Sequence, residues 1–294
     1  MQGLLTLAKD DSGAVREAAF ESLGTLGAAE ALQTLLDGFD DPHMGARQAA
    51  VLATGRVAPE EGVGAIAAVL DDPRPEMRFS AIWTLSHLGT GHEEQIAEGL
   101  SDQDPEVRVL AVECLGELGA VGYASSIAAQ LDDSSDAVRF AAATALASLG
   151  DPAGAPTLRA ALRKPAQAFP AAIGLGDLKD RESLEALRRL ASRRWSSPIL
   201  RAAAARGLVR LGDPAGTDVI RKLVRSWRIE ARQYAVQLVG ELGLTTLVPD
   251  LARAVRRSRE AERPVYETTL EQLAPKSSEA KVLLASLRQA KQSV

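Results

Sequence analysis

Residues 102–119 read DQDPEVRVLAVECLGELG, and residues 133–150, 31 positions further on, read DSSDAVRFAAATALASLG. In both stretches an arginine is followed by alanine three residues later and by leucine ten residues later. Apolar or small residues at positions −1, +3, +7 and +10 from that arginine lie on one face of a helix with about 3.6 residues per turn. We therefore expect a helix with one buried face, and its recurrence indicates a repeated unit.

The arginine recurs through most of the chain. Its positions are Arg16, Arg47, Arg78, Arg108, Arg139, Arg201, Arg232 and Arg263. Neighbouring arginines are 30 or 31 residues apart except for one interval of 62, and Ala168 takes the arginine position of the unit in between. The predicted helices stop at a glycine such as Gly119 or Gly150, and each is followed by a second, shorter helix, for example over residues 153–162. We predict an all-α fold, an α-α superhelix of about nine helix pairs.

The unit Asp-Asp-Pro-x-x-x-Val/Met-Arg-x-x-Ala-x-x-x-Leu-Gly-x-Leu-Gly resembles the HEAT-like repeats of bacterial proteins, first noted in phycobilin lyases. This resemblance covers essentially the whole chain. It implies that the arginine helices line the concave side of a solenoid and that an aspartate six residues before each arginine joins it in a ladder between repeats. Those aspartates are Asp10, Asp41, Asp72, Asp102 and Asp133. A planar guanidinium suits this position because it can bind a carboxylate and a carbonyl together.

Composition places the chain among globular proteins. Hydrophobic residues make up 46%, charged residues 25% and aromatic residues 4% of the sequence. The one cysteine, Cys114, excludes an internal disulfide and fits a reducing compartment. We find neither a signal-peptide pattern nor an apolar run of about 20 residues that could span a bilayer. We expect a soluble, cytoplasmic protein that does not enter a membrane.

The charge is distributed unevenly along the chain. Residues 1–150 carry 8 Lys+Arg and 24 Asp+Glu, whereas residues 151–294 carry 26 and 15. Such asymmetry bears on partners and on self-association. We predict acidic repeats over residues 1–162, an irregular sixth repeat over 163–180, and basic repeats with a capping helix over 181–294. The sixth repeat contains Pro165, Pro170, Gly174 and Gly176, and proline inside a helix produces a kink, so this repeat is the expected hinge.

A predicted partner-binding groove lies on the arginine helices. If positions −1, +3, +7 and +10 face the core, then +1, +5 and +8 face the solvent of the concave side, with +9 at its margin. The residues that we expect to bind a partner there are Phe79, Trp83, His87, Glu113, Glu117, Phe140, Phe169, Arg206 and Arg210. Aromatic side chains within a polar rim are typical of protein-binding surfaces. The alternative is that the aromatic residues lean sideways and pack between repeats.

A predicted basic edge lies on the turns that lead into the last arginine helices. Acidic turns in the first half of the chain are replaced there by Arg193, Arg194, Trp195, Arg225, Trp227, Arg228, Arg256, Arg257 and Arg259. Stacked repeats would align them in one ridge, which could bind phosphates and stack on bases or hold an acidic protein. The alternative is a solvated basic edge. The ladder aspartate is replaced by Trp195, Ser226 and Arg257, so the arginines that follow need other partners.

Signs of catalysis are weak. The three histidines, His43, His87 and His92, do not have the spacing of a metal site, and neither a phosphate-binding glycine loop nor a nucleophile motif occurs. We predict no cofactor, no metal ligand and no catalytic residue.

The function that we predict is a non-catalytic scaffold that binds a protein partner in the groove. Nucleic-acid or polyanion binding along the basic edge is one alternative. A bilin-lyase-like tetrapyrrole chaperone, implied only by the resemblance, is another. The chain is expected to be a monomer or to associate head to tail through its acidic and basic halves.

Overall fold

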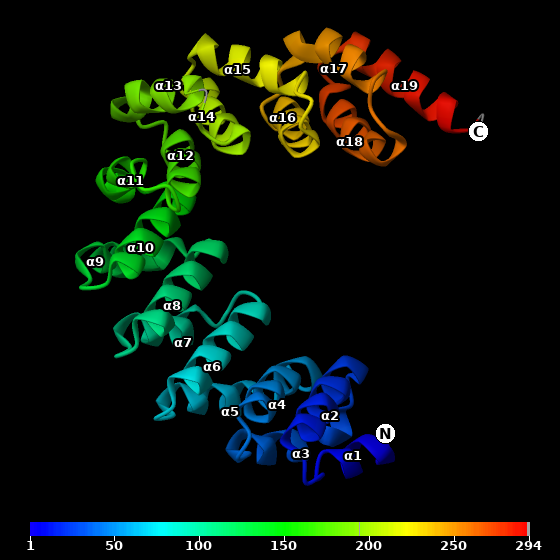
Figure 1. The fold of residues 1–294 in the computed structure, drawn as a ribbon. Coiled ribbons are helices and arrows are strands. Elements are labelled where there is room, and N and C mark those ends of the chain that lie inside the picture. The colour runs from blue at the N-terminus through cyan, green and yellow to red at the C-terminus, as the bar shows by residue number, and fades with distance from the viewer. Residues whose placement is uncertain (194, 293–294) are drawn as a thin grey trace. The chain divides into compact units, whose positions relative to one another are not determined.

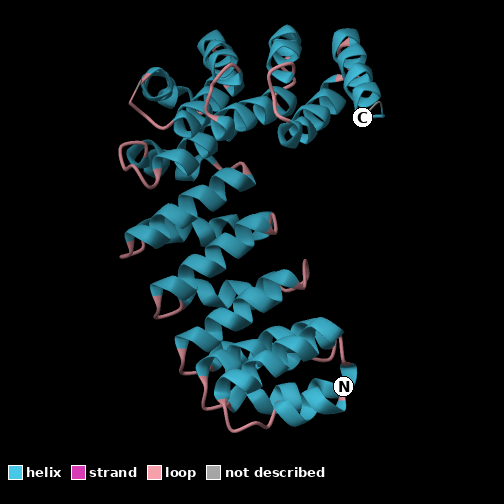
Figure 2. Cartoon of the chain, turned by 45° about the vertical axis from the view of Figure 1, so that its right-hand side comes forward, coloured by secondary structure: helices cyan, strands magenta, loops and turns pink. Residues whose placement is uncertain are grey.

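The computed structural model describes residues 1–193 and 195–292, with side chains through residue 289. Within these ranges the regular structure consists of α-helices and short 3-10 helices and contains no strand (Figure 2). The chain divides into two compact units, unit 1 (Met1–Gly154) and unit 2 (Ala155–Val294). Unit 1 carries 8 Lys+Arg and 25 Asp+Glu, and unit 2 carries 26 and 14, so the two units have opposite net charge.

Unit 1 contains five long helices that follow one another in a layer (Figure 1). They are α2 (Gly13–Leu26), α4 (Met44–Val57), α6 (Pro75–His87), α8 (Pro105–Glu117) and α10 (Asp136–Leu149). The shorter helices are α1 (Gln2–Leu7), α3 (Leu32–Asp37), α5 (Val63–Ala68), α7 (Glu93–Glu98) and α9 (Ala124–Ala129). The 3-10 helices are η1 (Ala29–Ala31), η2 (Gly38–Asp40), η3 (Val69–Asp71), η4 (Gly99–Ser101), η5 (Val121–Tyr123), η6 (Gln130–Asp132) and η7 (Pro152–Gly154). Helices α3, α5, α7 and α9 each pack against the long helix that follows.

Unit 2 repeats this arrangement. Its first layer is formed by α12 (Ala168–Asp177), α14 (Pro198–Arg210), α16 (Ile229–Glu241) and α18 (Arg263–Leu273), each in contact with the next. The other helices are α11 (Ala155–Ala161), α13 (Leu184–Ser192), α15 (Pro214–Val224), α17 (Val248–Val255) and α19 (Ser278–Gln292). Its 3-10 helices are η8 (Arg181–Ser183), η9 (Thr245–Leu247) and η10 (Glu260–Glu262).

The prediction of an all-α array of about nine helix pairs is confirmed. In the described part of the chain, the nine helices that carry the arginine position are each followed by a second helix. The caps form as expected: Gly27 and Gly150 end α2 and α10 with φ of 63° and 79°, a left-handed conformation that glycine adopts without strain. None of the described helices has both the length and the apolar character needed to cross a membrane.

The expectation for position +8 is wrong. This position is glycine in five of the long helices, and all five glycines are buried rather than solvent-facing; they are Gly24, Gly55, Gly116, Gly176 and Gly240. A Cβ atom on Gly116 would lie 2.8 Å from the Cβ and 3.0 Å from the Cα of Ala145 on the next long helix. The missing side chain therefore allows neighbouring long helices to approach closely.

An arginine ladder connects the repeats of unit 1. Arg78 donates to the carboxylate of Asp102 at 2.6 and 2.7 Å and to the carbonyl of Asp72 at 2.8 Å. Each such arginine thus binds the backbone of its own repeat and the carboxylate of the following one. The same geometry joins Arg16 to Asp41 and Arg108 to Asp133. These hydrogen bonds lower the pKa of Asp41, Asp102 and Asp133.

Two arginines of unit 1 have different partners. Arg47 binds Glu76 at 3.1 Å, because the carboxylate of Asp72 is held by Arg74 at 2.6 Å. Arg139 donates to the carbonyl of Asp133, six residues before it, as the other ladder arginines do in their own repeats. It also forms an ion pair with Asp136.

In unit 2 the ion pairs move to the second helices. Arg159 binds Asp180 at 2.8 Å and Arg188 binds Asp213 at 2.5 Å, and Arg225 is held by Asp250 in the same way. Arg159 and Arg188 lie within a second helix and Arg225 lies just after one, whereas each aspartate is at or near the start of the next second helix. The arginine positions that lost their aspartate use other acceptors. Arg201 donates to the carbonyl of Ala191 at 3.0 Å, and Arg232 donates to the carboxylate of Glu262 at 3.0 Å.

The sixth repeat begins its long helix late. Pro170 is the third residue of α12, where its missing N–H would have no partner within the helix. The expected kink is thus replaced by a shorter helix. The role of residues 163–180 as a hinge stays a prediction.

Candidate functional site

Six of the nine predicted groove residues lie on unit 1. Phe79 keeps 36% of its surface exposed, and Phe140 is half-buried at the corresponding position of α10. Trp83 is also half-buried: one part packs against the hydrophobic core and its ring stacks on His87, with centroids 3.7 Å apart. Trp83 is therefore partly packed against the core and covered by a residue of its own helix, whereas Phe79 is open to solvent.

Two hollows on this face are lined by carboxylates. The first, of about 250 Å³, lies beside Phe79 and includes Glu76, Asp104 and Glu106. The second, of about 210 Å³, lies between α8 and α10 and includes Glu113 and Glu117. Of the described residues that line the two hollows, none is a lysine or an arginine. We call the surface formed by these hollows with Phe79, Trp83, His87 and Phe140 the acidic face.

The two glutamates of α8 affect each other. Loss of solvent around its carboxylate raises the pKa of Glu113, and the negative charge of Glu117 raises it further. Of the lining carboxylates, Glu76 is paired with Arg47 at 3.1 Å, whereas Arg16, Arg78 and Arg108 are engaged by aspartates outside the lining. The acidic face thus keeps negative charge on Asp104, Glu106, Glu113 and Glu117 that no lysine or arginine of its described lining compensates.

The other three predicted groove residues lie on unit 2 and are engaged within it. Arg206 of α14 donates to Asp177 of α12 at 2.9 Å and to Glu241 of α16 at 2.7 Å. Arg210 also binds Asp177, at 3.0 Å. Phe169 of α12 contacts the ring of Tyr234 on α16, with centroids 6.1 Å apart.

These contacts tie α12, α14 and α16 together. The partners were not foreseen from the sequence, although Asp177 and Glu241 share position +9 of the repeat; Tyr234 lies at +2. With its guanidinium already held by two carboxylates, Arg206 has a structural role in the array.

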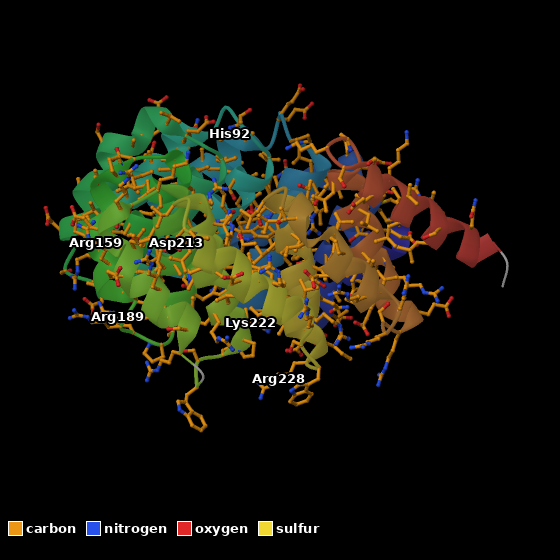
Figure 3. The ribbon with its side chains drawn as sticks, turned by 90° about the horizontal axis from the view of Figure 1, so that it is seen from above. His92, Arg159, Arg189, Asp213, Lys222 and Arg228 are labelled. Carbon is orange, nitrogen blue, oxygen red and sulfur yellow. The ribbon has the colours of Figure 1, made fainter. Side chains whose placement is uncertain are left out.

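The basic edge of unit 2 exposes two tryptophans. Trp195 is 95% exposed in the turn before α14, and Trp227 is 82% exposed in the turn before α16. The guanidinium of Arg228 lies 5.2 Å from the centre of the Trp227 ring, and Arg228 is seen at the rim of unit 2 in Figure 3. Arg193, Arg225, Arg256, Arg257 and Arg259 are also exposed, whereas Arg194 lies outside the described residues. We keep the name basic edge for the described members of this set.

Trp227 separates two open grooves. One, of about 430 Å³, runs between Trp227 and the start of α14 at Pro198 and Ile199. The other, of about 440 Å³, is lined by Arg225, Arg232, Arg253 and Arg257 together with Trp227. Arg253 was missed by the sequence analysis because it lies inside α17 and not in the turn.

Other reactive side chains have structural surroundings. Within the described residues, no three His, Cys, Asp or Glu side chains come together as metal ligands would. The ring of His43 accepts a hydrogen bond from the N–H of Ala46 and so caps α4. Cys114 is buried, and burial raises the pKa of its thiol, which disfavours the reactive thiolate.

Comparison with protein families matches the chain to repeat models. Residues 1–54 and 93–170 match HEAT repeats, and residues 200–226 match the PBS lyase HEAT-like repeat. No curated protein matches the chain.

Solved structures show a similar fold at low identity. The protein YibA of E. coli is 18% identical with a TM-score of 0.55, and the match covers 92% of this chain and 99% of that one. In the complex of CpcE and CpcF of phycocyanin lyase from Nostoc, the matched chain is 19% identical with a TM-score of 0.47, covering 74% of this chain and 91% of that one. Human deoxyhypusine hydroxylase is 18% identical with a TM-score of 0.38, covering 82% of this chain and 94% of that one. At such identities only the fold is shared.

Proposed function

This chain is a HEAT-repeat protein, and on that premise we propose that it is a non-catalytic scaffold whose acidic face binds a basic segment of a partner protein. Arrays of helix pairs commonly present extended binding surfaces. A cytoplasmic location belongs to the same proposal, since the one cysteine is compatible with a reducing compartment.

The observation that carries the proposal is the uncompensated negative charge next to an exposed aromatic ring. Phe79 borders a hollow that is also lined by the carboxylates of Asp104 and Glu106, while the third carboxylate of its lining, Glu76, is paired with Arg47. Glu113 and Glu117 form a second negative centre on the neighbouring helix pair. A lysine- or arginine-rich segment would neutralise these charges, and an apolar side chain on it would cover Phe79.

The test uses a defined probe: an amphipathic helical peptide with lysine on one face and leucine on the other. We expect the full chain to bind it at low salt and to release it as the salt concentration rises, because rim charges are screened. Glu113→Gln combined with Glu117→Gln should weaken binding at low salt. Phe79→Ala should weaken it about fivefold or more, the effect of a contributing aromatic contact.

A matched control is Glu98→Gln on α7, an exposed carboxylate outside the acidic face. It should leave peptide binding unchanged. Equal binding by all variants, or no binding by the unmodified chain at low salt, would refute the proposal. A drop in melting temperature with Phe79→Ala would assign that ring to the core. Sedimentation at low salt then tells whether the basic partner is a second copy of the chain, since the glutamate variants would abolish such association.

A further inference from the structure

The basic edge contains two aromatic side chains that the fold does not use. Trp195 and Trp227 are 95% and 82% exposed, on the turns before α14 and α16. Both lie five or six residues before the arginine position of consecutive repeats, so the repeat itself places them on the same edge. Large exposed aromatic rings among charged side chains mark surfaces that are covered by a ligand.

The groove between Trp227 and α17 has an excess of positive charge. The buried carboxylate of Asp250 is shared by Arg225, by Arg221 at 3.5 Å and by Arg253 at 3.6 Å. Glu262, also buried, is held by Arg232. Among the described residues that line this groove, four are arginines and none is acidic. Guanidinium groups present paired donors that match the oxygens of a phosphate.

A ligand of this edge must satisfy two requirements. It must carry negative charge at intervals, because arginines recur at three successive turns of the array, at Arg193, at Arg225 and Arg228, and at Arg256, Arg257 and Arg259. It must also offer flat groups to the tryptophans. In a single-stranded nucleic acid every unit supplies a phosphate and an unpaired base, whereas a duplex hides the faces of its bases.

Other polyanions meet these requirements less well. An acidic peptide supplies charge without a planar group at each step. An anionic bilayer offers charge in a plane, whereas Trp227 is flanked by two open grooves of about 430 and 440 Å³ that a flat surface would not fill.

We infer that the basic edge of unit 2 binds single-stranded nucleic acid without reading its sequence. Bases stack on the indole rings of Trp195 and Trp227, and Arg253 and Arg257 hold phosphates in the groove beside Trp227. Arg228, 5.2 Å from the centre of the Trp227 ring, adds a further cation beside that indole. This surface is on the opposite unit from the acidic face, so either proposal can fail without the other.

The experiment measures binding of labelled oligo-dT to the full chain by fluorescence anisotropy at several salt concentrations. Trp227→Ala should raise Kd about 5- to 150-fold, the effect of losing one base–aromatic stack, whereas Trp227→Phe should keep most of the affinity. Arg257→Ala should reduce the slope of log K against log salt by about 0.7, the contribution of one single-strand phosphate contact. Because Trp227 and Arg257 are exposed, circular dichroism and melting temperature should stay unchanged.

The matched control is Arg181→Ala, which removes an exposed arginine from η8, in the turn between α12 and α13 rather than in one that leads into a long helix. It should change neither the affinity nor the salt slope. A duplex of equal length, anionic vesicles and polyglutamate serve as competing probes. Absence of oligo-dT binding at low salt would overturn the inference. So would binding that does not depend on Trp227, or tighter binding of vesicles, duplex or polyglutamate.

Discussion

Replacing Gly55 by alanine tests the close approach of the long helices. A Cβ atom at Gly55 would lie 2.4 Å from the Cγ2 of Thr84 on the next long helix. Carbon atoms prefer separations of about 3.5–4.0 Å, so the helices would have to move apart by roughly 1 Å. Thr84 cannot turn its methyl group away cheaply, because its hydroxyl donates to the carbonyl of Ser80 at 2.7 Å.

The magnitude depends on two opposing effects. Overpacking a close contact costs about 1–3 kcal/mol. Alanine in place of a helical glycine contributes about 1 kcal/mol of stability. Gly55→Ala should therefore destabilise unit 1 by up to about 2 kcal/mol.

A second substitution isolates the contact. Thr84→Ser removes only the offending methyl group and keeps the hydroxyl, at a cost of about 1 kcal/mol for the lost apolar contact. In that background Gly55→Ala meets no Cγ2, so only the gain in helix propensity remains. The same substitution should then stabilise the protein by about 1 kcal/mol. The coupling energy between the two sites should be about 1–3 kcal/mol.

Tryptophan fluorescence during urea unfolding provides the assay. Trp83 is the one tryptophan of unit 1 and is half-buried beside Thr84, whereas the tryptophans of unit 2 are already exposed in the folded state. The change in fluorescence therefore reports mainly on unit 1. An equal shift of the urea midpoint by Gly55→Ala in the parent and in the Thr84→Ser variant would refute the requirement for glycine at position +8, because a Cβ atom there would then not clash with Thr84.

Three further predictions concern other contacts. Asp102→Asn should cost about 1–3 kcal/mol at neutral pH, because the fork of Arg78 loses its charged acceptor. As the folded-state pKa of Asp102 is lowered, that stability is lost as pH falls through it, and chemical denaturation should show variant and parent converging in acid. Glu113→Gln should raise the melting temperature at neutral pH and have no effect in acid, because the raised pKa means that the charged form is the destabilising one. Gly176→Ala should destabilise unit 2 by up to about 2 kcal/mol in urea titration, since its Cβ would lie 2.6 Å from the Cα of Gly207 and the gain in helix propensity offsets only part of that cost; a midpoint shifted to higher urea would contradict the contact.

The sequence was sufficient to predict the helices but not their neighbours. Periodicity identifies which residues share a face, and glycine at the helix ends marks the caps, so the helix pairs can be located directly. Glycine at +8 is compatible with a solvent-facing position and with a buried one. Only the contact with the next helix, as between Gly116 and Ala145, decides between them.

Partners from other repeats are also hard to predict. The ladder aspartates were identified, yet the carboxylate of Asp72 pairs with Arg74 and not with Arg47. In the described residues, no other ladder aspartate pairs with an arginine two residues after it. The ion pairs of the second helices in unit 2 were not foreseen, although the register aligns two of them: Arg159 and Arg188 each lie 20 residues after an arginine position, and Asp180 and Asp213 each lie 12 residues after the next one. The exposed tryptophans and the carboxylates of the acidic face could be located from the repeat, but whether they bind anything stays a prediction.

The move of the ion pairs from the long helices to the second helices has a consequence for how such a protein can be shortened or extended. Within unit 1, Arg16, Arg78 and Arg108 each face an aspartate of the next repeat, so deleting a whole repeat between two of them should keep such a pair. A fusion that joined the repeat of Arg78 directly to that of Arg201 would place Trp195 where the carboxylate of Asp102 now lies. We therefore expect repeats to be exchanged more readily between positions that keep the arginine–aspartate pair than across the junction, where Trp195 replaces the carboxylate.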